Sequence, residues 1–574
     1  MLRKIMQAMA VAICIFGLIC APTQSRSEGR AGQAGQASPA QVASPASQPP
    51  AQASATPAAS ASRTIVCPVT SETAPPLSAP LAAAQKLYRT GKFDEAIAAY
   101  QAVVPAGGSE AAAGYAGLAQ VYLRRKNPAD AYAAAMKAVA LTPDRAPAIV
   151  ALGEVYFRQG KIGEAEAAFL KPLIACNLDA RAYLGLNRIY RATLNWKRAK
   201  TDIDQAYKLD PGDPDIRRAY LATLAGQERI KALQSYLAGD TDDDSETLEN
   251  LKNELTVLES ESNHPQNVCR LVTNLTSTET RLEQLLVDSQ HIRGYGLNVK
   301  VNGVSSRLML DTGASGILID RKIAEKAGIK SIVNDKINGI GDKGGAAGYL
   351  GHADKIQIGA LEFENCFVEV ASGRSVLGDD GLIGADVFRH FLVDMDMPNE
   401  KFKLSELPPI PNEAASGVSL DSHSSGQRNL HDRYIAPEMK DYSKIFLIGH
   451  ALLIPTSVNS FPPKLFLIDT GSFDNTLSIA AAKEVTKISQ SDAQVKGLSG
   501  DVKNVYRASK ATLVFSHFKQ EREDLITFDL THFSDSLGTE VSGVLGFAML
   551  RMLDMKIDYR DGLVSFTYDK NRFH

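Results

Sequence analysis

The stretch Leu308–Gly316 reads LMLDTGASG, and the stretch Phe466–Phe473 repeats it as FLIDTGSF. The aspartates of the two Asp-Thr-Gly triplets, Asp311 and Asp469, lie 158 positions apart. The downstream strings INGIG and VKGLSG keep this spacing, because their central glycines are also 158 positions apart. Further on, LIGADVFRHFLVDMD and VLGFAMLRMLDMKIDY each place an aspartate twelve positions after a glycine. The second half of the chain is therefore an internal duplication.

Each triplet is preceded by a pattern that is typical of paired β-strands. Residues 294–311 alternate polar and apolar side chains around the dipeptide Asn302-Gly303, which favours a tight turn between two strands. Residues 450–469 repeat this arrangement before the second triplet. The apolar residues directly before each aspartate are expected to form buried strands that hold the triplet loops. The segments Leu382–Gly384 and Val544–Gly546 are expected to pack beneath those loops.

With its triplet, its glycine-containing hairpin and its hydrophobic-hydrophobic-glycine segment, each half resembles one subunit of a retropepsin-like aspartic protease. The resemblance covers residues 292–406 and 443–570. In that family two subunits each contribute one aspartate to a shared active site, and in pepsin-like enzymes both copies lie on one chain. The resemblance implies an all-β acid-protease domain of two homologous lobes, with Asp311 and Asp469 as its catalytic residues.

The resemblance also implies roles for the neighbours of the two aspartates. Thr312 and Thr470 are expected to hydrogen-bond across the interface, and the triplet glycines let the loop backbone approach the carboxylates. The residues expected to support the active-site loops are Thr312, Gly313, Ala314, Thr470, Gly471 and Ser472. The residues expected in substrate-binding flaps are Gly339, Ile340, Gly341, Gly497, Leu498, Ser499 and Gly500. Ordinary turns are the alternative for these glycine strings, and neither string has the tyrosine that a pepsin-like flap carries.

Two close carboxyl groups suit peptide hydrolysis without a metal or a covalent nucleophile. One carboxylate takes a proton from water while the other group protonates the substrate. Two adjacent carboxyls that share one proton serve both purposes, because like charges that close cannot both ionise. No cofactor is expected, since the histidines are scattered singly and no metal-ligand spacing, Walker loop or dinucleotide fingerprint occurs.

The N-terminus is typical of an exported protein. Residues 1–24 begin with Arg3 and Lys4 and continue into an apolar run, which is typical of a secretory signal. Residues 25–77 are rich in Ala, Pro and Ser and are predicted to be a disordered tether. We therefore expect a periplasmic or secreted protein. A membrane tether is expected only if the signal segment stays uncleaved, and Ile19 before Cys20 argues against a lipid anchor.

Residues 78–225 show a helical repeat. Two sets of residues recur every 34 positions: Tyr122, Tyr156 and Tyr190, and Ala131, Ala165 and Ala199. This is the tetratricopeptide period and predicts an all-α solenoid, with a generic Ala-rich bundle as the alternative. Such a solenoid offers a surface for a protein partner. The other expected segments are a helical connection at 226–290, the first lobe at 291–406, a linker at 407–442 and the second lobe at 443–574.

Charge and cysteine content limit the alternatives. The net charge is −3, which points neither to nucleic acid nor to a membrane surface as a partner. Of the six cysteines, four lie beyond the signal segment, and their spacing specifies neither a metal site nor a disulfide connectivity. Export would permit disulfides.

The sequence thus predicts an exported aspartic endopeptidase that acts on a peptide or protein substrate. One rival is a scaffold protein whose lobes bind peptides without cleaving them, and another is an enzyme whose lobes pair only between two chains. Pairing within one chain predicts carboxyls roughly 3 Å apart. It also predicts a pseudo-two-fold axis that relates Asp311 to Asp469, Gly339 to Gly497 and Gly384 to Gly546.

Overall fold

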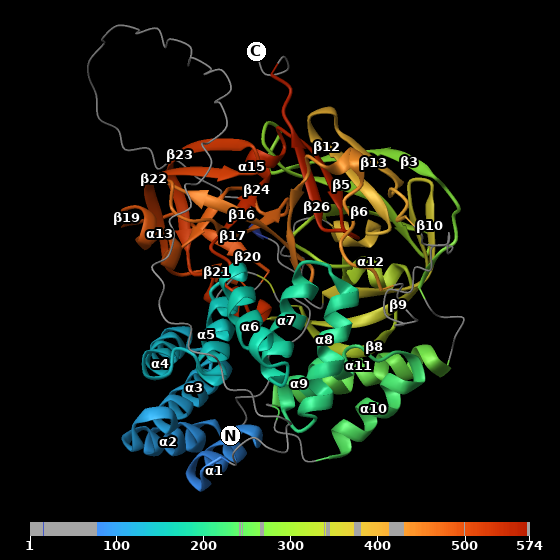
Figure 1. Ribbon diagram of the computed structural model, residues 1–574. Helices are drawn as coiled ribbons and strands as arrows, with labels where there is room; N and C mark the ends of the chain where they lie inside the picture. Colours follow the sequence, from blue (N-terminus) through green and yellow to red (C-terminus); the bar gives the residue numbers. More distant parts are fainter. Residues whose placement is uncertain are drawn as a thin grey trace, which may run out of the picture.

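A helical region comes first in the chain and a β-rich part follows it (Figure 1). The computed structural model describes residues 77–239, 243, 245–263, 269–337, 339, 345–371, 380–411, 430–498 and 500–570, and the backbone of strand β1, Ile15–Phe16, which pairs with β20, Val495–Gly497. The expected signal segment and tether lie otherwise outside the described residues. In the part of the chain that the structure describes, no helix has the length and hydropathy needed to cross a membrane.

The helical region is built from consecutive helices that pack in pairs. They are α1 Ala79–Arg89, α2 Phe93–Val103, α3 Gly108–Arg124, α4 Pro128–Leu141, α5 Ala146–Arg158, α6 Ile162–Ala175, α7 Ala180–Ala192, α8 Trp196–Leu209, α9 Pro214–Leu221, α10 Gly226–Ala238 and α11 Ser245–Asn263. Small residues allow the close approach of neighbouring helices. A Cβ on Gly185 would stand 2.5 Å from the Phe169 ring, and a Cβ on Gly153 would stand 2.8 Å from the same ring. Phe169 is therefore held between α5 and α7.

Charged side chains link helices that are far apart in sequence. Asp215 in α9 accepts hydrogen bonds from the Tyr88 hydroxyl of α1 (2.9 Å) and from Arg124 of α3 (3.2 Å). Arg181 of α7 pairs with Asp215 at 3.2 Å and with Asp213 at 2.6 Å. Burial acts to raise the pKa of Asp215, but the surrounding arginines outweigh it and hold the pKa below its usual range. Helices α1, α3, α7 and α9 are thus linked to one another through buried polar and charged side chains.

The expected helical connection at 226–290 is wrong in its second part. The last helix of the helical region, α11, ends at Asn263. The chain then forms β2 Arg270–Leu271, β3 Ser277–Arg281 and β4 Glu283–Leu286. These strands pair with β10, β13 and β5 of the β-rich part. A disulfide between Cys269 and Cys366 fastens this segment to β10, and Cys176 in the helical region is also disulfide-bonded. Pairing with distant strands overrides the weak local helical character of residues 270–286.

Three large sheets make up most of the described β-rich part, beside the small sheet β1-β20-β21. The first has the order β2-β10-β7-β11-β6-β5-β9-β8, the second β15-β16-β17-β24-β18-β23-β22-β19, and the third β14-β26-β25-β12-β13-β3. The strands from the first half are β5 Ile292–Val301, β6 Val304–Asp311, β7 Ile317–Asp320, β8 Ser331–Ile337, β9 Ala346–Ile358, β10 Leu361–Ala371, β11 Gly381–Gly384, β12 Phe391–Asp396 and β13 Lys401–Glu406.

The strands from the second half are β14 Ser443–Lys444, β15 Phe446–Ile448, β16 Ala451–Val458, β17 Lys464–Asp469, β18 Thr476–Ser478, β19 Ile488–Gln490, β20, β21 Gly500–Val502, β22 Val505–Phe515, β23 Phe518–Phe528, β24 Gly543–Gly546, β25 Asp554–Asp558 and β26 Leu563–Thr567. Short helices join them: α12 Arg321–Lys326, α13 Ile479–Val485, α14 Thr531–Leu537 and α15 Phe547–Leu550. The predicted turn between β5 and β6 is confirmed, because Asn302 and Gly303 both have positive φ, 47° and 82°.

The third sheet contains strands from both halves of the duplication. Strand β12 pairs antiparallel with β25 in a ladder whose central residues are Asp394 and Lys556. These two positions are 162 apart, the same spacing that separates Gly384 from Gly546. Lys556 Nζ lies 3.0 Å from Asp394 Oδ2. The ladder is therefore centred on a pair of equivalent positions, as a local two-fold arrangement requires.

The segment expected to be a linker is anchored at its C-terminal end. Trp196 N in α8 donates to the His431 carbonyl at 3.0 Å, and Arg198 pairs with Asp432 at 3.3 Å. Tyr434 N donates to Asp561 at 2.7 Å. Residues 430–434 therefore lie between the helical region and the C-terminal strands.

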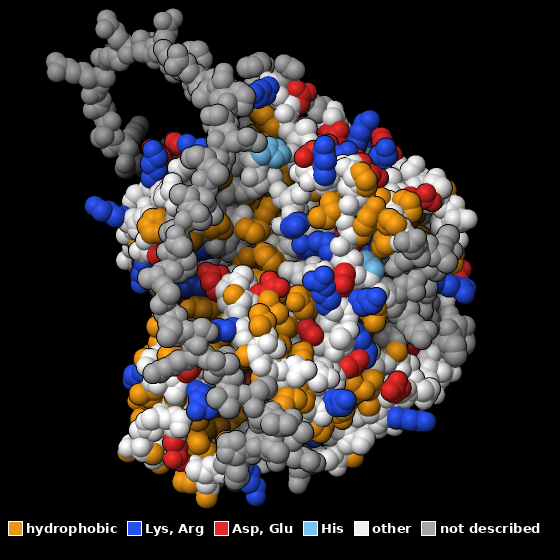
Figure 2. Space-filling model, viewed as in Figure 1, with side chains coloured by type: hydrophobic (Ala, Val, Ile, Leu, Met, Phe, Trp, Pro, Cys, Tyr) orange, Lys and Arg blue, Asp and Glu red, His pale blue; other side chains and the backbone are white. Residues whose placement is uncertain are grey.

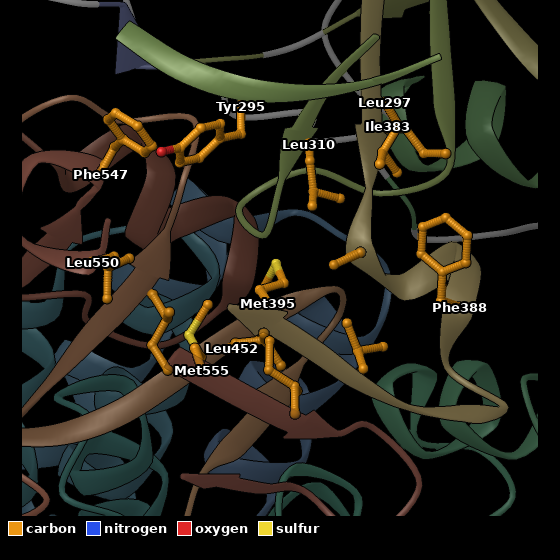
Figure 3. Close-up of a cluster of buried hydrophobic side chains, with 14 of the residues drawn as sticks. Tyr295, Leu297, Leu310, Ile383, Phe388, Met395, Leu452, Phe547, Leu550 and Met555 are labelled. Carbon is orange, nitrogen blue, oxygen red and sulfur yellow. The ribbon is translucent and has the colours of Figure 1, made fainter. Parts of the chain in front are cut away.

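Acidic and basic side chains are interspersed on the face of the molecule drawn in Figure 2. Beneath the surface, one apolar core runs through both halves of the β-rich part (Figure 3). Tyr295 of β5 meets Phe547 of α15 edge to face, with ring centroids 5.4 Å apart. Met395 and Met555, which face each other on β12 and β25, belong to the same cluster. This shared core fixes the two halves relative to each other.

Candidate active site

The two triplets occupy corresponding places in the first two sheets. Strand β6 ends at Asp311 and runs parallel to β11, with Asp311 opposite Gly384. Strand β17 ends at Asp469 and runs parallel to β24, with Asp469 opposite Gly546. Both aspartates are fully buried, at 0% exposure. The segments that were expected beneath the triplet loops are thus β11 and β24, which pair with the strands that end at the two aspartates.

Reciprocal hydrogen bonds join the two triplet loops. Thr312 N donates to Thr470 Oγ1 and Thr470 N donates to Thr312 Oγ1, both at 3.0 Å. The Thr312 hydroxyl donates to the Ile468 carbonyl at 2.8 Å, and the Thr470 hydroxyl donates to the Leu310 carbonyl at 2.9 Å. Each threonine therefore bonds to the strand end of the other half, and the bonding expected between them is present.

Each carboxyl group lies against the glycine of the opposite triplet. A Cβ on Gly313 would stand 2.6 Å from Asp469 Cγ, and a Cβ on Gly471 would stand 2.5 Å from Asp311 Cγ. Asp311 Oδ1 accepts a hydrogen bond from Gly313 N at 2.8 Å. Asp469 Oδ1 accepts from Gly471 N at 2.9 Å and from Ser472 N at 3.1 Å. Only glycine permits each carboxyl to lie this close to the backbone of the opposite triplet.

Burial and mutual repulsion set the protonation of the pair. Burial raises the pKa of Asp469 well above its usual range, and the charge of Asp311 and a side-chain hydrogen bond with Asp311 raise it further. The N–H groups of Gly471 and Ser472 act in the opposite direction. Among the described residues, no N–H or O–H group donates to Asp469 Oδ2. Burial and the like charge of Asp311 thus both favour one shared proton on the pair.

A further set of polar residues surrounds the first triplet, and sequence reasoning missed it. Asp386 accepts from the Ser315 hydroxyl at 2.7 Å and from Gly316 N at 3.0 Å. Burial lowers the pKa of His450, while Asp386 and the Gly313 backbone act to raise it. Burial also raises the pKa of Tyr559, and the charges of Asp386 and Asp311 add to that rise. Both rings therefore stay neutral near the carboxyl pair at neutral pH.

The second loop is held differently. Gly546 N donates to Asn475 Oδ1 at 2.7 Å, whereas Gly384 N donates to the Gly316 carbonyl at 2.8 Å. The position equivalent to Asp386, two residues after Gly546, is Ala548. The signal available in the sequence was the aspartate two residues after Gly384. Because the second half has alanine at the equivalent position, comparison of the two halves does not single out this aspartate.

The residues expected in flaps are described in part. Gly339, Gly497, Leu498 and Gly500 are described, whereas Ile340, Gly341 and Ser499 lie outside the described residues. Gly497 and Gly500 pair across the hairpin β20–β21. Leu498 between them is 7% exposed and belongs to an apolar cluster with Met309, Ala314 and Ile337. The second hairpin therefore reaches the residue that follows the first triplet. Among the described residues, no group of His, Cys, Asp and Glu is arranged to hold a metal ion.

Comparison with known proteins finds a similarity to aspartyl proteases in the first half. A family model described as aspartyl protease matches residues 297–387. DNA damage-inducible protein 1 of Chaetomium globosum is 31% identical over 134 residues, which cover 23% of this chain and 29% of that protein. UBA domain-containing protein Mud1 of Schizosaccharomyces pombe is 27% identical over 145 residues, which cover 22% of this chain and 42% of that protein. The chain thus spans less than half the length of these relatives. The segment around Asp311 is aspartyl-protease-like, and the match does not extend to Asp469.

Among solved structures, an aspartic proteinase from Irpex lacteus has a TM-score of 0.31 and 13% identity, covering 52% of this chain and 98% of that one. A thermophilic TPR protein from Thermus thermophilus has a TM-score of 0.25 and 18% identity, covering 32% of this chain and 97% of that one. TM-scores this low do not establish a shared fold.

Proposed function

We propose that the protein is an aspartic endopeptidase in which Asp311 and Asp469 form one catalytic pair. The observation that carries this proposal is the reciprocal bonding of Thr312 and Thr470, which joins the two triplets of one chain around two buried carboxyls. The aspartyl-protease match to residues 297–387 supports the same reaction class.

In this proposal the pair works with one shared proton. We assign the proton to Asp469, whose pKa is raised by burial and by the charge of Asp311, and the ionised Asp311 removes a proton from a water molecule. The water oxygen then forms a bond to the carbonyl carbon of the peptide, and Asp469 donates its proton to the carbonyl oxygen. Collapse of the tetrahedral intermediate breaks the C–N bond, and the leaving nitrogen takes the proton that Asp311 had received. As the carboxylic acid product forms, a hydroxyl of the intermediate returns its proton to Asp469. The pair thereby returns to its starting charge.

Both lobes are proposed to come from one chain. Residues 291–406 and 443–574 would be homologous lobes, and residues 78–225 a tetratricopeptide solenoid with a surface for a protein partner. Support for intramolecular pairing comes from the bonds between the triplets and from the core that contains Tyr295 and Phe547. A second copy of the chain is not needed to complete the pair. Export to the periplasm or beyond is proposed from the composition of residues 1–24.

Asparagine substitution at each aspartate tests the proposal. Asp311→Asn and Asp469→Asn keep the size of each side chain but remove the ability to share a proton, so each should abolish cleavage of an unfolded protein substrate. The matched control is Asp380→Asn. Asp380 also accepts a backbone hydrogen bond, from Arg307 N at 2.8 Å, but it does not belong to the carboxyl pair, so this variant should keep its activity. Full activity in either pair variant would refute the proposal.

The non-cleaving alternative makes a different prediction for binding. A catalytic pair should bind a statine-containing peptide more tightly than the same peptide without the statine, because that group resembles the tetrahedral intermediate. Equal affinities, measured by calorimetry, together with no cleavage would favour a peptide-binding protein.

A further inference from the structure

The helical region packs on the same face of the second sheet that carries Asp469. Leu465, Leu467 and Asp469 alternate along β17 and therefore point to one face. Leu465 and Leu467 belong to an apolar cluster that they share with α5, α6 and α7, whereas Phe466 and Ile468, on the other face, belong to the central core. The helical region thus covers the neighbourhood of one carboxyl.

The same cluster includes the base of the hairpin β20–β21. Val495 of β20 is buried in it, and Ala493 and Val502 pack against it. The members contributed by the helices are Val150, Ile162, Ala165, Phe169, Ala182, Leu186 and Ile189. Opening of this hairpin would therefore separate it from α5–α7 and expose apolar surface.

The first hairpin, β8–β9, is also in contact with the helical region, through α11 against β8. Figure 1 shows α11 beside β8 and α5–α7 below β20 and β21. Strand β8 ends at Ile337, which is 2% exposed and lies in one apolar cluster with Leu498 of the second hairpin. Ala314, the residue after the first triplet, is in that cluster too. Strand β8 and the hairpin β20–β21 therefore contribute to the same apolar cluster beside the first triplet, and the helical region contacts both.

Specific polar bonds fix the helical region to the second half. Arg158 at the end of α5 pairs with Asp535 of α14, and the two side chains are only 12% and 13% exposed. Glu540 N donates to the Arg158 carbonyl at 2.8 Å, and the Thr539 hydroxyl donates to the Phe157 carbonyl at 2.7 Å. These bonds lie at the loop that follows α14, beside the shared apolar cluster.

From these contacts we propose that the helical region is an intramolecular clamp on the two hairpins. While it is seated, it holds β8 and β20–β21 closed beside the carboxyl pair and restricts the entry of a protein substrate. Displacement of α5–α7 releases the second hairpin and raises the rate of cleavage. The effect on cleavage rests on the function proposed above, whereas the restraint of the hairpins does not.

Charge reversal at the Arg158–Asp535 pair tests the clamp in the full-length chain. Arg158→Glu places two like charges in a largely buried contact, and the double variant R158E/D535R restores opposite charges. Amide hydrogen exchange at residues 495–502 should be faster by roughly tenfold or more in the single variant, since local opening controls exchange there. The double variant should return to the parent rate. Measurement in an Asp311→Asn background keeps this readout independent of cleavage.

Lys464→Glu is the matched control. It reverses one charge of the Lys464–Glu484 pair, 2.7 Å apart, which joins β17 to α13 within the second half and does not involve the helical region. Its exchange at 495–502 should equal that of the parent. In the background with both aspartates intact, Arg158→Glu should raise kcat/KM for a protein substrate, and the control should not.

The outcomes separate the two proposals. Unchanged exchange at 495–502 in the Arg158→Glu protein overturns the clamp, whether or not any variant cleaves. If exchange is faster in Arg158→Glu but neither the parent nor any variant cleaves the substrate, the result supports the clamp and counts against the proposed protease activity. If Arg158→Glu loses its helical circular dichroism, Thr539→Val, which removes only the bond to the Phe157 carbonyl, replaces it and should accelerate exchange in the same direction.

Discussion

Replacement of Thr312 by valine should destabilise the β-rich part by several kcal/mol. The Thr312 hydroxyl donates to the Ile468 carbonyl at 2.8 Å and accepts from Thr470 N at 3.0 Å. Valine has nearly the same shape but fills neither role, so a buried carbonyl and a buried N–H both lose their partner. A buried group left without its partner costs about 1–3 kcal/mol, which gives about 2–6 kcal/mol for the two bonds together. The carboxyl pair would also be less rigidly held, so kcat should fall more than KM rises.

Urea denaturation followed by circular dichroism measures the loss in the free energy of unfolding. Thr312→Ser is the control, because serine keeps the hydroxyl and removes only a methyl group. It should retain most of the stability and activity. Thr470→Val should cost the same as Thr312→Val, since the two residues make equivalent bonds. A loss below about 1 kcal/mol in Thr312→Val, or an equal loss in the serine control, would show that these bonds do not hold the loops.

Gly471→Ala should abolish cleavage and leave the rest of the fold intact, because its Cβ would stand 2.5 Å from Asp311 Cγ; a protease assay and circular dichroism check this. Asp469→Asn should gain stability over the parent as pH rises from 4 to 8. The raised pKa of Asp469 means that the parent is most stable while this group is protonated and loses stability as pH rises through the folded-state pKa. A difference in unfolding free energy that does not change with pH contradicts this reasoning. Replacing Cys269 and Cys366 by serine should cost about 2–4 kcal/mol, because the disulfide closes a long loop; equal urea midpoints with and without the disulfide would argue against that cost.

The sequence was sufficient to predict the elements whose signals are local or repeated. The turn at Asn302-Gly303 follows from residues that tolerate positive φ, and the strands that end at Asp311 and Asp469 follow from alternation and duplication. The repeat of 34 positions predicted helices in the first part of the chain. Whether Asp311 and Asp469 act together in catalysis remains a prediction.

The features that could not be predicted depend on partners far along the chain. Strand β3 has little apolar character of its own and forms because β13, more than a hundred residues later, offers it an edge. Asp386 was overlooked because its role appears only when β11 brings it to Ser315 and Gly316. In the sequence His450 is one isolated histidine among several, since nothing local connects it with Gly313.

The Asp394–Lys556 pair at the centre of the β12–β25 ladder has a consequence for which halves can pair with each other. At a two-fold axis each residue of a homodimer faces its own copy, so two first halves that met in this way would set Asp394 against Asp394. Two second halves would set Lys556 against Lys556. Like charges directly opposite each other on paired strands are destabilising, whereas the fused chain joins an acid to a base at 3.0 Å. Opposite charges at these two positions therefore favour pairing between the first and second halves over pairing of either half with its own copy.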